Sequence, residues 1–167
     1  MKRRDVLKAG ALGAAGLALG AQSSRRFRFK MCTTWSPQLP ILQEAADLFA
    51  NMLRIASNGE LDVRVYAGGE LIPPLGVFDA VSQGVVHMGV GSPYYWAGKD
   101  KTLQFFGSMP FGMNSNQFRA WMIQGDGKKL WEEAYGNFDL VPFSFGNTGP
   151  QMGGWFKKPL NSASDLK

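Results

Sequence analysis

FRFKMCTTWSPQLPILQEAADLFANMLRIASNGELDVRVYA, residues 27–67, is the stretch that decides the fold. Apolar and polar residues alternate over residues 27–34 and again over residues 61–67, which is the period of a β-strand with one buried face. Between them, apolar residues recur at helical spacing over residues 42–56, and an Asn-Gly pair at residues 58–59 gives a stop signal. The stretch therefore predicts a strand, an amphipathic helix and a second strand.

The same alternation of strand and helix continues after this stretch. Residues 75–83 predict a short helix that two prolines introduce, and residues 85–90 predict a buried third strand. The order βαβαβ with short links implies a parallel sheet covered by helices, because parallel neighbours need crossover connections. The sequence thus predicts an α/β fold.

The remaining chain is less regular. Residues 91–116 are dense in Gly, Pro and aromatic residues, which predicts a loop region that packs over the sheet edge or lines a cleft. Helical spacing returns over residues 116–135, with a break expected at residues 125–127, where two glycines flank an aspartate. Residues 140–145 predict a fourth strand, and the turn-rich segment 146–154 follows it.

Residues 1–21 have the layout of a secretory signal. Basic residues that include Arg3 and Arg4 precede an uncharged, apolar run over residues 9–21, which is too short to span a bilayer. The paired arginines resemble the consensus of twin-arginine signals, with an ordinary Sec signal as the alternative. Both predict export, so we expect a periplasmic protein whose fold excludes this segment.

The charge balance and the residue inventory exclude several classes of function. The whole chain has a net charge of +5, but residues 1–20 hold four basic and one acidic side chain, which leaves 14 basic and 12 acidic side chains. This near balance predicts no nucleic acid partner. Cys32 and His87 are single, so this chain alone cannot assemble a structural zinc site or a His-based triad, and His87 is expected to be structural. An exported enzyme that folds around a cofactor stays the alternative function, although the chain has no CxxC pair and no dinucleotide fingerprint.

Four stretches carry a resemblance to a known family. They are TTWSP (residues 33–37), YAGGELIPPLGVFDAVSQG (66–84), GSPYYWAGK (91–99) and GNTGPQMGGWF (146–156). In this order and with these intervening elements, they resemble the solute-binding proteins of tripartite ATP-independent periplasmic (TRAP) transporters, in the subgroup that binds 2-oxo acids and related small carboxylates. The resemblance covers almost all of the chain after the signal.

The resemblance implies a two-lobed α/β protein that closes on a small organic anion and delivers it to membrane permease subunits, without catalysis. A homodimer is a further expectation. Residues 22–145 correspond to the first lobe, and residues 146–167 correspond to the crossover toward a second lobe that this sequence lacks. In the family the second lobe supplies an arginine for the substrate carboxylate, and a bidentate guanidinium is the strongest partner of a carboxylate. We therefore expect little or no ligand binding by this fragment.

The candidate substrate-binding residues are Gln151, Tyr94, Tyr95, Trp35 and Asn147. The resemblance places Gln151 where the family has a glutamine that contacts substrate and metal, and its amide carbonyl suits a sodium or calcium ion. No other cofactor is expected. Tyr94 and Tyr95 follow a strand end, where ligands of α/β sheets collect, and Trp35 follows the first strand in the same way. Packing or turn formation is the alternative role for each candidate.

Overall fold

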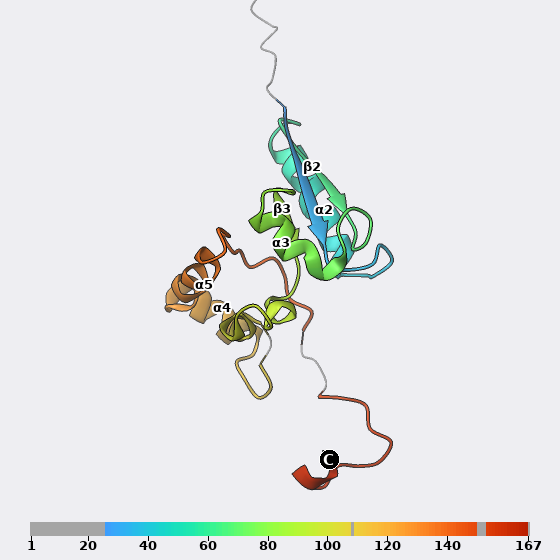
Figure 1. The fold of residues 1–167 in the computed structure, drawn as a ribbon, viewed down its shortest axis with the longest axis vertical. Helices are drawn as coiled ribbons and strands as arrows, with labels where there is room; N and C mark the ends of the chain where they lie inside the picture. The colour runs from blue at the N-terminus through green and yellow to red at the C-terminus, as the bar shows by residue number, and fades with distance from the viewer. Residues whose placement is uncertain (1–25, 108, 150–152, 167) are drawn as a thin grey trace, which may run out of the picture.

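The computed structural model describes residues 26–107, 109–149 and 153–166 of the chain. At its centre is a parallel sheet in which β1 (Phe27–Thr33) lies between β2 (Leu61–Tyr66) and β3 (Met88–Val90) (Figure 1). β1 pairs with β2 along six residue pairs and with β3 along three. The α/β class and the parallel sheet expected from the sequence are confirmed.

Two helices cover opposite faces of this sheet. α2 (Leu42–Ala56) connects β1 to β2, and α3 (Val77–Ser82), which the 3-10 turn η2 (Pro74–Gly76) precedes, leads toward β3. Neighbouring residues of a strand point to opposite faces. Met31 packs in a cluster with residues of α2, whereas Cys32 packs in a cluster with residues of α3. At the end of β1, residues 31–33, both faces are therefore buried, one under each helix.

The second part of the chain builds a helical region beside the sheet (Figure 1). Its elements are η3 (Pro93–Trp96), η4 (Lys101–Phe106), α4 (Ser115–Gln124) and α5 (Gly127–Gly136). The helix break expected at residues 125–127 is confirmed, because α4 ends at Gln124 and α5 begins at Gly127. Near the end of the chain a single 3-10 turn, η5 (Ala163–Leu166), lies well away from the sheet in Figure 1.

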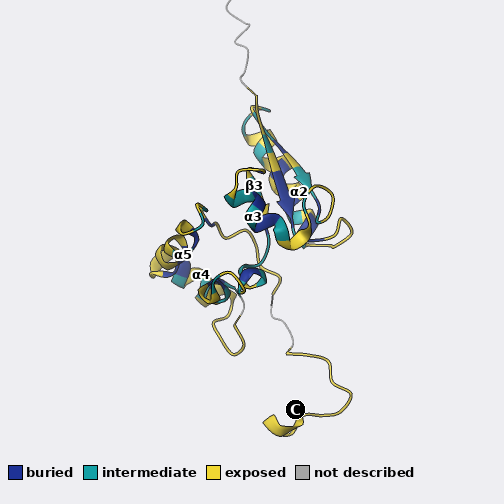
Figure 2. Cartoon of the chain, viewed as in Figure 1, coloured by how far each residue is buried: buried dark blue, intermediate teal, exposed yellow. Residues whose placement is uncertain are grey.

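Aromatic side chains form the largest of the three core clusters in the described residues. Its buried members are Phe78, Trp96, Leu103, Phe106, Met122, Trp131 and Tyr135. The ring of Phe78, from α3, has its centroid 5.2 Å from that of Trp96 and 5.7 Å from that of Tyr135. Burial of this apolar surface holds the helical region against the sheet side of the molecule. Figure 2 shows the contrast with the chain after α5, which is almost entirely exposed.

The strand expected over residues 140–145 is not formed, so this prediction is wrong. Among the described residues the segment pairs with no strand, and the side chains of Val141 and Phe143 are 71% and 73% exposed. Alternating apolar residues favour an extended backbone, but a strand also needs a partner for its N–H and C=O groups. Among the described residues, β2 and β3 each have an outer edge, but residues 140–145 pair with neither of them.

Two other elements differ from expectation. β3 begins at Met88 and not at residue 85, because the N–H groups of Val85 and Val86 donate to the carbonyl of Ala80 at the end of α3. Residues 91–116, expected to be a loop region, contain η3 and η4. Apolar residues of both turns pack into the aromatic cluster, and this packing orders a stretch that has no regular period.

The single histidine and the single cysteine are both structural. His87 Nδ1 accepts a hydrogen bond from the backbone N–H of Lys30 at 3.0 Å, and its ring meets Phe29 edge to face at 5.5 Å. Cys32 is a buried free thiol, and burial raises its pKa, which Lys30 partly offsets. Both side chains therefore take part in packing around β1.

The signal predicted for residues 1–21 lies outside the described residues. The boundary expected at residue 145, between a first lobe and a crossover over residues 146–167, stays a prediction. In the part of the chain that the structure describes, no helix is long and apolar enough to cross a membrane.

Leu103 offers a direct test of the aromatic cluster, because its side chain is fully buried. We expect Leu103→Ala to lower the free energy of unfolding by about 2–5 kcal/mol, since it removes buried carbon atoms and leaves a cavity. Urea unfolding followed by far-UV circular dichroism measures the change. Ile123→Ala on α4, where the side chain is 67% exposed, is the control and should change stability by less than about 0.5 kcal/mol. Equal losses in the two variants would contradict this core.

Candidate functional site

The carboxyl ends of the three parallel strands meet at one edge of the sheet. Trp35 lies just after β1, Gly68 after β2 and Gly91 after β3. In open α/β sheets this is the edge where ligands bind. The Gly68 N–H donates to the Trp35 carbonyl at 2.7 Å, and the Thr34 N–H donates to the Val90 carbonyl at 3.0 Å. Backbone hydrogen bonds thus tie the three strand ends together.

The structure brings two of the sequence-predicted residues, Trp35 and Tyr95, into contact at this edge. The Trp35 indole Nε1–H donates to the Tyr95 hydroxyl at 3.4 Å, although 60 residues separate them in the chain. Trp35 is only 9% exposed, so packing fixes its ring as well as this bond. The Tyr95 hydroxyl also forms a hydrogen bond with Tyr94, and a phenol hydroxyl can both accept and donate.

Tyr94 lies beside this pair. Its ring meets that of Tyr95 edge to face, with centroids 4.8 Å apart, and its side chain is exposed to solvent. Partial burial raises the pKa of the Tyr94 phenol above its ordinary value, and a hydrogen bond with Ser92 opposes the shift. The Tyr94 phenol is therefore neutral at physiological pH and can act as a hydrogen-bond donor.

Trp96, which the sequence reasoning missed, anchors the turn that carries both tyrosines. Its Nε1–H donates to the Leu75 carbonyl at 3.0 Å. Gly91 lets the ring approach the strand end, because a Cβ there would lie 2.5 Å from Trp96 Cη2 and 2.8 Å from Thr34 Cγ2. The run of three aromatic residues is plain in the sequence, but which of them anchors the turn depends on packing.

The remaining described candidate, Asn147, is not brought to this contact. Asn147 is exposed in the segment after α5, and its Oδ1 accepts a hydrogen bond from the Gly149 N–H at 2.6 Å. This bond closes a local turn, which is the alternative role considered for Asn147. Gln151 lies outside the described residues.

The described residues contain no cluster of the side chains that most often bind metal ions. Nowhere among them do three or more His, Cys, Asp or Glu side chains gather in a way that could hold an ion. Calcium takes roughly six to eight oxygen ligands, and carboxylates are prominent among them. Backbone carbonyl and side-chain amide oxygens also serve as ligands of such ions.

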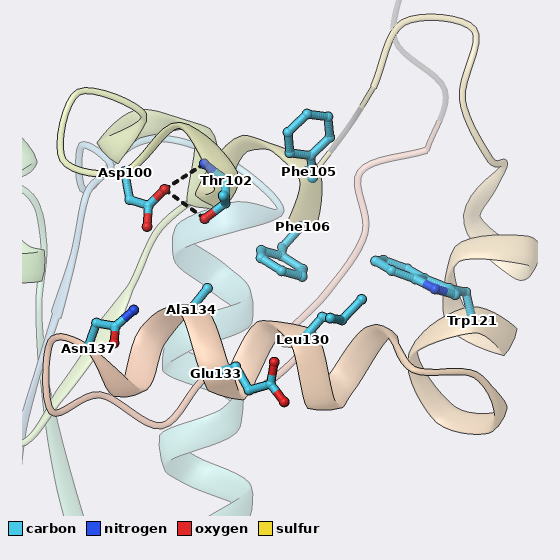
Figure 3. Close-up of a pocket in the computed structure, with 9 residues that line it drawn as sticks. All are labelled: Asp100, Thr102, Phe105, Phe106, Trp121, Leu130, Glu133, Ala134 and Asn137. Atoms are coloured by element: carbon cyan, nitrogen blue, oxygen red, sulfur yellow. Dashed lines mark hydrogen bonds between the residues drawn. The ribbon is translucent and has the colours of Figure 1, made fainter.

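A groove of about 460 Å³ lies between η4 and α5, and none of the four described candidates lines it (Figure 3). Phe106 and Trp121 stack nearly parallel beside it, with centroids 6.3 Å apart. The Asp100 carboxylate accepts hydrogen bonds from the Thr102 N–H and hydroxyl, each at 2.8 Å, and these bonds lower the pKa of Asp100. With Asp100 and Glu133 among its lining residues, this groove disfavours a carboxylate ligand.

Comparisons with known proteins agree on one family. The model of bacterial extracellular solute-binding protein family 7 matches residues 31–167. Over its full length, the chain is 40% identical to the monocarboxylate 2-oxoacid-binding periplasmic protein of Nostoc sp., of which it covers 48%. The match thus includes the sheet, the helical region and the segment that follows it.

Two solved structures of TRAP periplasmic solute-binding proteins are similar to this chain. The Pseudoalteromonas atlantica protein, with bound sodium and pyruvate, is 39% identical with a TM-score of 0.81. The Colwellia psychrerythraea protein, with bound calcium and pyruvate, is 40% identical with a TM-score of 0.82. Each match covers 86% of this chain and 44% of the other. The chain therefore spans about half the length of these relatives.

The close approach at Gly91 generates a prediction. We expect Gly91→Ala to destabilise the fold by about 1–3 kcal/mol, because the added methyl group would overlap Trp96 and Thr34. Gly98→Ala is the matched control, since nothing lies within 4 Å of a Cβ at that position, and it should change stability by less than about 0.5 kcal/mol. Urea unfolding measures both variants, and a Gly91→Ala variant as stable as the wild type would refute the contact.

Proposed function

The chain belongs to family 7 of the bacterial extracellular solute-binding proteins, and from this premise we propose that it contributes the N-terminal half of a TRAP solute-binding protein for a small 2-oxo acid. The observation that carries the proposal is the meeting of Trp35 and Tyr95 at the carboxyl edge of the parallel sheet. This edge lies in a chain that is 39% and 40% identical to proteins whose structures hold pyruvate. We propose that this edge forms one wall of the ligand site.

The chemistry of the wall suits an anion with an apolar body. A 2-oxo acid presents a carboxylate and a neighbouring carbonyl, and both accept hydrogen bonds. Tyr94 and Tyr95 supply phenol hydroxyls as hydrogen-bond donors, while the Trp35 ring supplies an apolar surface. A hydrogen bond to a charged group contributes about 1.5–3 kcal/mol, so two phenols alone give weak binding. Tight capture then needs a cation from the remaining part of the protein, for which an arginine is best suited.

The proposal includes a sodium or calcium ion beside the ligand, with Gln151 as one of its ligands and Asn147 as a further contact to the substrate. The two pyruvate-bound relatives support it, because one holds sodium and the other calcium. Amide carbonyl oxygens are suitable ligands for both ions. When bound, the ion supplies positive charge next to the substrate carboxylate.

A protein that captures a ligand for uptake works outside the cytoplasm and passes the ligand to proteins in the membrane. The family is extracellular by description, and the relative from Nostoc sp. is periplasmic. We propose that residues 1–21 direct export by the twin-arginine route and that membrane permease subunits receive the ligand. A homodimer stays a prediction.

The comparisons favour binding over the alternative of an exported cofactor-containing enzyme. The matching family and the similar structures are those of transport proteins that bind solutes. An absorbance spectrum of the purified chain distinguishes the two functions. A bound chromophore would favour the enzyme.

A chimera tests whether this chain supplies a working wall. In it, residues 26–167 replace the corresponding half of the Pseudoalteromonas atlantica protein, whose own second half is kept. We expect calorimetric titration with pyruvate in sodium buffer to show saturable binding by the chimera and little or none by the 167-residue chain alone. A folded chimera that does not bind, beside a parent protein that does, would contradict the proposal.

The contribution of the Tyr95 hydroxyl can be measured in the same chimera. We expect Tyr95→Phe to weaken pyruvate binding about tenfold, because it removes one hydrogen-bond donor to a charged ligand. Tyr135→Phe removes a hydroxyl from the aromatic cluster on α5 and is the matched control, with no change expected in affinity. Unchanged affinity in Tyr95→Phe would show that this hydroxyl does not contact the ligand.

A further inference from the structure

Thr33 and Gln43 form a buried polar pair in an otherwise apolar core. Among the described residues they are the two polar side chains classed as buried, 0% and 5% exposed. The Thr33 hydroxyl donates to Gln43 Oε1 at 2.7 Å, which links the last residue of β1 to the first turn of α2. Burying either polar group without a hydrogen-bond partner would lower the stability of the fold by about 1–3 kcal/mol. In the pair, each group is the partner of the other.

Filling space does not require a polar pair here. Two apolar side chains of the same shape would pack in its place at little net cost. Buried polar networks instead favour one arrangement of the groups that they join. The role of the pair therefore depends on what else it contacts.

The pair also contacts the backbone of Trp35. A hydroxyl has one proton, and the bond from Thr33 to Gln43 is its shortest, so the Thr33 oxygen is left to accept from the Trp35 N–H at 3.4 Å. On the other side, the Gly68 N–H donates to the Trp35 carbonyl at 2.7 Å. The Trp35 backbone is thus held between α2 and the end of β2.

The position of this backbone decides whether the indole reaches its partner. The bond from Trp35 Nε1 to the Tyr95 hydroxyl is 3.4 Å long, at the upper limit for a hydrogen bond, so a small displacement would break it. We propose that Thr33 and Gln43 are positioning residues of the ligand site, which hold the Trp35 backbone so that Trp35 and Tyr95 form one wall. This inference rests on the proposed function, because the positioning role has a purpose only if Trp35 and Tyr95 contact a ligand. Thr33 and Gln43 act through Trp35 and not by contacting the ligand themselves.

Nuclear magnetic resonance of the 167-residue chain, with ¹⁵N-labelled tryptophan, measures the position of Trp35 directly. Trp35→Phe identifies its indole resonance, and Tyr95→Phe gives the shift produced when the indole loses its acceptor. We expect Thr33→Val, which removes the hydroxyl but keeps the shape, to shift the Trp35 resonance in the same direction. Thr33→Ser keeps the hydroxyl and should restore the wild-type position. The indole resonances of the aromatic cluster should stay unchanged in both variants.

Gln43→Met provides a second variant if Thr33→Val does not fold, because it keeps the length of the side chain without the amide oxygen. It should shift the same resonance. An unmoved Trp35 resonance in a folded variant would overturn the positioning role, and so would the full shift in Thr33→Ser. Loss of folding in both Thr33→Val and Gln43→Met would also overturn it, since the pair would then stabilise the whole fold. These readouts need no ligand, so a chimera that fails to bind pyruvate would overturn the proposed function alone.

Discussion

Parallel pairing of β1 with both β2 and β3 is the constraint on which the rest of the structure depends. Strands that run in one direction cannot be joined by tight turns, so the chain must cross the sheet between them. α2 and α3 make these crossings on opposite faces, and the last three residues of β1 become buried. The strands then all end at the same edge, where Trp35, Gly68 and Gly91 follow them.

Packing at that edge leaves the side chains little freedom. A Cβ at Gly68 would lie 3.0 Å from the backbone carbonyl carbon of Thr34, and one at Gly91 would overlap the ring of Trp96. These glycines let backbone and ring come close enough to fix the turn that carries Tyr95.

The spacing of apolar residues along the sequence made the sheet and its helices predictable, as the alternation of apolar and polar residues over 27–31 illustrates. The same reasoning predicted a strand over residues 140–145 that is not formed. Alternating apolar residues indicate a preference for extended backbone, but they do not show whether the segment pairs with another strand. Trp35 and Tyr95 could be chosen because each lies just after a strand, but their contact joins positions 60 residues apart and no local pattern encodes it. The burial of Gln43 likewise depends on a partner in another element.

The central claim is that the carboxyl edge of the sheet, with Trp35 and Tyr95, contacts the ligand. A crystal structure of the chimera grown with pyruvate and sodium tests it most directly. Our account predicts pyruvate within hydrogen-bonding distance of the Tyr95 hydroxyl, with the Trp35 ring against it. Pyruvate bound in the groove between η4 and α5, or at any place that leaves Trp35 and Tyr95 untouched, would contradict it.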